Sequence, residues 1–96
     1  MELVIKGFEF RTSGSAAPFS EFQRNYADIG ALLGKEVILP VLASRVVLND
    51  VQADAVELTL EAVGDARSIR LEIGKPQTLR FEQNIVGIEF TLALNE

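Results

Sequence analysis

The stretch from residue 54 to residue 94 alternates between apolar and polar side chains with a period of two. This period places successive side chains on opposite faces of a β-sheet, so one face is apolar and the other is charged. Such a pattern is typical of antiparallel strands that cover a core on one side and meet water on the other. The sequence therefore predicts a C-terminal meander of four strands over residues 54–94.

Charged side chains on the polar face of this meander also predict how its strands pair. With loops of common hairpin length, opposite charges meet across each strand pair, and a slip by two residues would bring like charges together. Because exposed ion pairs contribute only about 0.2–1 kcal/mol each, we expect the pairs to fix the register more than to add stability. The predicted ladder has two rows, Glu61–Arg70–Glu82 and Glu72–Arg80–Glu89.

The N-terminal part of the chain must provide the second half of the core. Residues 2–11 are rich in strand-forming side chains and alternate over residues 8–11, which predicts a first strand. The segment Thr12–Pro18 is rich in small and turn-forming residues and predicts a loop. It lacks the glycine and lysine spacing of a phosphate-binding loop, so we interpret it as a connector.

One amphipathic helix is predicted over about residues 19–33. Apolar side chains recur there at spacings of three and four residues, as on one stripe of a helix. The stripe consists of Phe19, Phe22, Tyr26, Ile29 and Leu33. Ser20 is a candidate N-cap residue, with Gln23 as its capping-box partner. We expect the stripe to cover the apolar face of the C-terminal sheet, and docking on a partner protein is the alternative.

Residues 37–48 form the most apolar stretch of the chain. Their β-branched content predicts strands, and Pro40 predicts either a break between two short strands or a corner in one bent strand. Continuous rather than alternating hydrophobicity indicates burial on both sides. If the domain has one core, the second side is a subunit interface. The predicted interaction surface consists of Val37, Leu39, Val41, Leu42, Val46 and Leu48.

Together these elements predict a mainly β fold in a single domain over residues 1–96. The expected architecture is an antiparallel β-sandwich or a partly open barrel, with the helix covering one face or one opening. A two-layer α+β arrangement is the alternative. One helix covers a sheet of more than four strands poorly, which favours the sandwich.

The composition argues against most kinds of catalysis. The chain has no cysteine and no histidine, so thiol chemistry, the usual general base and the commonest transition-metal ligand are all missing. Glu57 and Glu61 share one strand face, but acid–base work by two carboxylates needs a cleft that raises one pKa. The predicted surroundings are instead an open face with arginines. We therefore expect no enzyme, no cofactor and no metal site.

The net charge of −5 also bears on partners, because it opposes binding to phosphate backbones. We expect no nucleic acid partner. No stretch approaches the roughly 18 apolar residues of a membrane span, and the first residues lack the basic start of a signal peptide. The expected location is therefore the cytoplasm.

The leading functional hypothesis is a non-catalytic structural or protein-interaction module that forms a homo-oligomer or a subunit of a larger assembly. The alternative is a carrier that holds a small apolar ligand inside the barrel or sandwich. The residues predicted to line that cavity are Phe8, Phe10, Phe22, Tyr26, Phe81 and Phe90. An enzyme that uses carboxylates is the third hypothesis.

Overall fold

The structure, a computed structural model, describes residues 1–14 and 17–96. Strands account for most of these residues, and the one helical element described is a short 3-10 helix. In chain order the elements are β1 (Glu2–Arg11), β2 (Ser20–Tyr26), η1 (Ile29–Leu32), β3 (Glu36–Ile38), β4 (Arg45–Val51), β5 (Ala55–Ala62), β6 (Asp65–Glu72), β7 (Gln77–Gln83) and β8 (Val86–Asn95).

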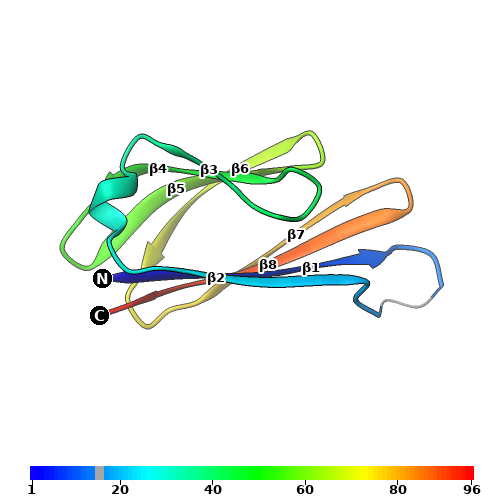
Figure 1. Cartoon of the computed structure of the whole chain (residues 1–96), viewed down its shortest axis with the longest axis horizontal. Helices are drawn as coiled ribbons and strands as arrows, with labels where there is room; N and C mark the ends of the chain where they lie inside the picture. The colour runs from blue at the N-terminus through cyan, green and yellow to red at the C-terminus, as the bar shows by residue number, and fades with distance from the viewer. Residues whose placement is uncertain (15–16) are drawn as a thin grey trace.

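These strands form two antiparallel sheets of four strands each. Sheet A has the order β2-β1-β8-β7, and sheet B has the order β3-β4-β5-β6. The two sheets face each other, and the connection from β6 to β7 carries the chain from one to the other (Figure 1). The first and last strands pair at the centre of sheet A, from Glu2 opposite Asn95 to Arg11 opposite Val86. Among the described strands no closed barrel forms.

Side chains from both sheets share one hydrophobic core. Alternation along each strand places every second side chain on the inner face, as with Leu3 and Ile5 of β1 and Leu58 and Leu60 of β5. All four are fully buried. Because burying one such side chain stabilises the fold by about 1.5–3 kcal/mol, this shared core is what holds the two sheets together.

The predicted C-terminal meander is wrong in its topology, because its four strands divide between the two sheets. The hairpin β7–β8 has the predicted register, with Arg80 opposite Glu89. In the hairpin β5–β6, the two residues Val63 and Gly64 make a tighter turn than predicted, and Arg70 faces Glu57 instead of Glu61. The pairs Arg70–Glu82 and Glu72–Arg80 cannot form across a β6–β7 pairing, because β6 and β7 lie in different sheets.

The reason for this error is physical. Alternation shows that each strand has one buried face, but it does not show which strands are neighbours in a sheet. A meander in one sheet and two hairpins in facing sheets have the same alternation.

The predicted helix over residues 19–33 is also wrong. Residues 20–26 form β2, which pairs with β1 from Leu3 opposite Tyr26 to Glu9 opposite Ser20. Only Ile29–Leu32 are helical, as the single 3-10 turn η1. Phe22 and Tyr26, four residues apart, share a face in a strand as well as in a helix, so their spacing fits both structures. The backbone pairing with β1 selects the strand over the helix for residues 20–26.

Elsewhere the predicted elements agree more closely with the structure. Residues 2–11 form β1, and the break predicted at Pro40 separates β3 from β4. The predicted loop Thr12–Pro18 includes Ser15 and Ala16, which lie outside the described residues. No helix within the described ranges is long and apolar enough to cross a membrane.

Candidate functional site

The structure distributes the predicted interaction surface between the core and one turn. Four of its residues are at most 1% exposed in the shared core: Leu39, Val41, Val46 and Leu48. Val37 is half-buried against the same core. Leu42 is 50% exposed at a turn. The buried residues of the stretch 37–48 therefore fill the space between the sheets, whereas Ile38 and Leu42 are its exposed large apolar side chains, at 61% and 50%.

The six predicted ligand-lining residues divide between the two faces of sheet A. On the inner face, the Phe90 ring contacts Phe81 edge-on at 5.8 Å between centroids and Phe22 at 6.3 Å. Tyr26 packs against the same core. Alternation along β1 places Phe8 and Phe10 on the outer face, where their rings lie 5.8 Å apart. The six side chains thus do not surround one common space.

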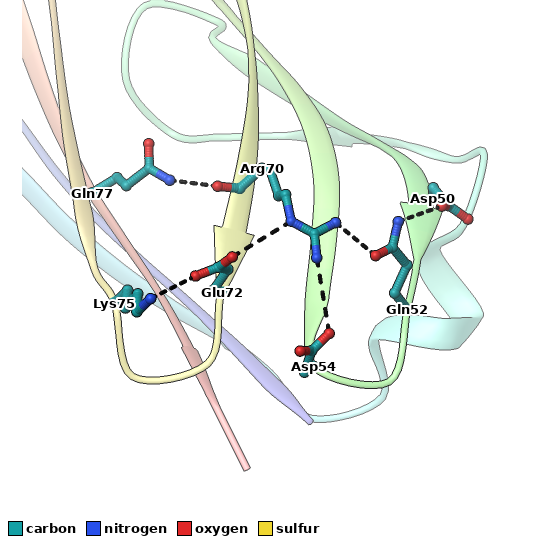
Figure 2. Close-up of polar contacts among 7 residues, drawn as sticks. All are labelled: Asp50, Gln52, Asp54, Arg70, Glu72, Lys75 and Gln77. Carbon is teal, nitrogen blue, oxygen red and sulfur yellow. Dashed lines mark hydrogen bonds and ion pairs between the residues drawn. The ribbon is translucent and has the colours of Figure 1, made fainter.

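A cluster of polar side chains lies at one end of sheet B, centred on Arg70 of β6 (Figure 2). The Arg70 Nη1 donates a hydrogen bond to Oε1 of Gln52 at 2.6 Å. Its Nε lies 3.6 Å from Oε1 of Glu72, and its Nη2 lies 3.9 Å from Oδ1 of Asp54. Gln52 and Asp54 belong to the turn between β4 and β5, so Arg70 joins that turn to the edge strand β6.

The same cluster extends to the connection between the sheets. The Lys75 Nζ lies 3.0 Å from Oε2 of Glu72. The Gln77 Nε2 of β7 donates to the backbone carbonyl of Arg70 at 2.5 Å, which satisfies a polar group on the β6 edge from the other sheet (Figure 2). These contacts link β6 to β7.

Arg70 occupies the position between carboxylates that a bound cation would need. Among the described residues, no group of three or more His, Cys, Asp or Glu side chains has the geometry of a metal site. The ion-paired side chains around Arg70 are each at least 40% exposed, so the pairs contribute little individually. We interpret the cluster as a link between turns rather than a binding site.

The Lys75–Glu72 contact gives a testable titration. The Lys75 hydrogen bond and charge lower the pKa of Glu72 below its ordinary value of 4.5. A lowered carboxyl pKa means that the contact favours the folded state above the ordinary pKa and is lost as the pH falls through the folded value. We expect an NMR titration of the Glu72 side-chain carbonyl carbon to show a midpoint below 4.5, and Lys75→Ala to move it upward. Lys35→Ala is the matched control, and an unchanged midpoint in Lys75→Ala would contradict the contact.

A second feature is the pair of strained turns at the opposite end of sheet B. Leu42 and Ala43 have φ values of 45° and 49°, and Val63 has a φ of 45°. The Ser44 amide donates to the Val41 carbonyl at 2.9 Å, which closes the first turn. Left-handed backbone costs an ordinary L-residue about 1–2 kcal/mol, so Asn and Gly usually occupy such positions.

A shallow hollow of about 460 Å³ lies between these two turns. The Arg45 side chain borders it and forms ion pairs with Glu61 at 2.5 Å and with Glu36 at 3.2 Å. These contacts already neutralise the Arg45 charge, and the hollow is open to solvent. The first turn could not be predicted from the sequence, because Leu-Ala is not a turn-forming pair. For the second turn, Gly64 beside Val63 is the available signal.

The third feature is the outer edge of β2, which sequence analysis missed because it predicted a helix there. β2 is the terminal strand of sheet A and pairs with β1 over seven residues without a register shift. It contains no proline. The carbonyl of Gln23 accepts a hydrogen bond from the exposed guanidinium of Arg24 at 3.0 Å. The edge strand of a sheet has unpaired backbone N–H and C=O groups, which can form hydrogen bonds with another strand.

Comparison with protein-family models, with curated proteins and with solved structures gave no match. The surface of this chain is therefore the basis for assigning a function. Of its three features, the β2 edge has the chemistry most suited to a macromolecular contact, because main-chain hydrogen bonds can extend sheet A beyond it.

Proposed function

We propose that this chain is a non-catalytic protein-interaction module that self-associates, as a homo-oligomer or as a subunit of a larger assembly. In this proposal the two facing sheets form an antiparallel β-sandwich that serves as a scaffold. The observation that carries the proposal is the edge of β2, seven residues long and terminal in sheet A. An edge of this length can bind a further strand through backbone hydrogen bonds.

The surroundings of the two candidate catalytic carboxylates favour this proposal over an enzyme. Glu61 forms an ion pair with Arg45, and both side chains are at least 40% exposed. Glu57 is an exposed residue of β5 and faces Arg70 of β6 in the strand register. An open face of this kind does not provide the desolvated cleft that raises a carboxyl pKa for acid–base catalysis.

The mass in solution tests self-association directly. In a concentration series, we expect light scattering to give a weight-average mass that rises from the 10.5 kDa of one chain toward twice that value. Because each copy carries a net charge of −5, added salt screens the repulsion and should shift the rise to lower protein concentration. A mass of one chain at every concentration and at high salt would contradict the proposal.

A further inference from the structure

We infer that the strand that binds β2 is β2 of a second copy, paired antiparallel about a two-fold axis beside Gln23. Two copies of sheet A then form one continuous sheet of eight strands. This inference rests on the proposed self-association and adds the surface and the register. The argument for it comes from the four sheet edges, the length of β2 and the charges along it.

The other three terminal strands are less suited to self-pairing. β3 has only three residues. On β6, the backbone carbonyl of Arg70 already accepts a hydrogen bond from the Gln77 side chain. β7 has seven residues, but pairing about its centre would place Arg80 opposite the second copy's Arg80. Like charges directly opposite each other destabilise a strand pair. β2 is longer than β3, and its central residue Gln23 carries no charge. The Gln23 carbonyl also accepts a side-chain hydrogen bond, but from the neighbouring Arg24 of the same strand and not from the other sheet.

The two-fold symmetry restricts the register. If residue i faces residue j of the second copy, residue j must face residue i, and both must lie on the same face of the sheet. The axis therefore passes beside one residue, and this residue faces the same residue of the second copy. Centring on Gln23 pairs all seven residues of Ser20–Tyr26. Centring on Phe22 or Arg24 pairs only residues 20–24 or 22–26.

Side chains along the strand also favour the register centred on Gln23. On the outer face, Glu21 meets the second copy's Asn25. On the inner face, Phe22 meets the second copy's Arg24, an arrangement that allows a cation–π contact. A register centred on Arg24 would instead oppose two guanidinium groups. β2 contains one acidic and one basic residue, so the paired edges are neutral although each chain carries a net charge of −5.

Arg24 must move for this pairing to form. Its guanidinium donates to the carbonyl of Gln23 in the single chain, which shields this part of the edge. The contact is exposed and joins neighbours in sequence, so an incoming strand can replace it with a backbone hydrogen bond and release Arg24 toward the facing Phe22. The exchange keeps the Gln23 carbonyl satisfied.

The absence of cysteine from the chain makes a cross-linking test unambiguous. In the inferred dimer, Gln23→Cys places the thiol of one copy opposite the same thiol of the second copy. Facing Cα atoms in an antiparallel pair are about 4.5–5.5 Å apart, within the roughly 4.4–6.8 Å that a disulfide spans. Gln23 is exposed, so the substitution should not disturb the fold.

Glu21→Cys and Asn25→Cys are matched controls on the same strand and face. In the inferred register, each of these positions is offset by four residues from the same position in the second copy. This offset is roughly 13 Å along the strand, which is too far for a disulfide. Under mild oxidation we expect Gln23→Cys to form the linked dimer at least tenfold faster than either control alone. A mixture of Glu21→Cys and Asn25→Cys should link to each other, because these positions face one another. Intact mass and a non-reducing gel measure both results.

The outcomes separate this inference from the proposed function. If light scattering shows a dimer but Gln23→Cys links no faster than the controls, β2 pairing in this register is wrong and self-association stands. If either control links fastest on its own, the register is wrong. If the mass is that of one chain under all conditions, both the inference and the proposed function fail.

Discussion

Gly87→Ala is expected to lower the free energy of unfolding by about 1–3 kcal/mol. On the outer face of sheet A, the ring of Phe10 lies across Gly87, and a Cβ atom added there would be 2.2 Å from its Cζ. The guanidinium of Arg80 covers the same ring at 4.1 Å from its centroid, and Phe10 is only 1% exposed. The ring would have to leave this site and lose its burial. Urea denaturation of the variant measures the effect.

Two further variants identify the cause of this loss. Once Phe10→Ala has removed the ring, adding Gly87→Ala should cost little more, so the double-mutant cycle should show strong coupling. Gly30→Ala is the matched control, since its nearest contact would be Asp28 Oδ1 at an ordinary 3.6 Å. A Gly87→Ala chain as stable as the parent would show that Phe10 does not pack on this glycine.

Leu42→Asn combined with Ala43→Gly is expected to raise the free energy of unfolding by about 1–2 kcal/mol. Both residues have left-handed backbone angles, and Asn-Gly is the pair that such a two-residue turn prefers. Greater freedom of glycine in the unfolded chain offsets part of the gain. Leu42 is 50% exposed, so removing its side chain sacrifices little burial. The midpoint of urea denaturation should shift upward.

Leu42→Ala alone is the control for this prediction, because it shortens the side chain without relieving the backbone. We expect it to give no gain in stability. A double variant with a lowered midpoint would mean that the turn does not have left-handed angles at both positions.

The pairing of β7 with β8 was the part of the topology that the sequence predicted best. The tight connection between Gln83 and Val86 leaves few registers, and Arg80 and Glu89 face each other in the one that forms. The relation of β6 to β7 could not be predicted in the same way. Residues 73–76 are long enough for a hairpin or for a crossing between sheets, and only the packing of the whole core selects one of them.

The candidate site was less predictable than the fold. Phe22 and Tyr26 fit a helix and a strand equally well, so the edge that β2 forms was hidden by a spacing shared by both structures. The hydrophobicity of residues 37–48 does not alternate, and such a pattern predicts an interface from the sequence alone. In the structure Leu39 and Val41, on either side of Pro40, are both buried in the core. A connection that buries Leu39 and Val41 while its turn stays exposed therefore resembles a two-sided strand in the sequence.

Pairing of β1 with β8 affects the order in which this protein can fold during synthesis. Sheet B consists of four strands consecutive in the chain, so its hairpins can form while translation continues. Sheet A has β8 between β1 and β7, and β1 must wait for contacts more than 70 residues away, such as Arg11 with Val86. Closing such a long loop is slow. Without β8, the Leu3 and Ile5 side chains would lose part of their cover, and β1 would present an unpaired edge in addition to that of β2. The pairing of β8 with β1 therefore completes both the core and sheet A.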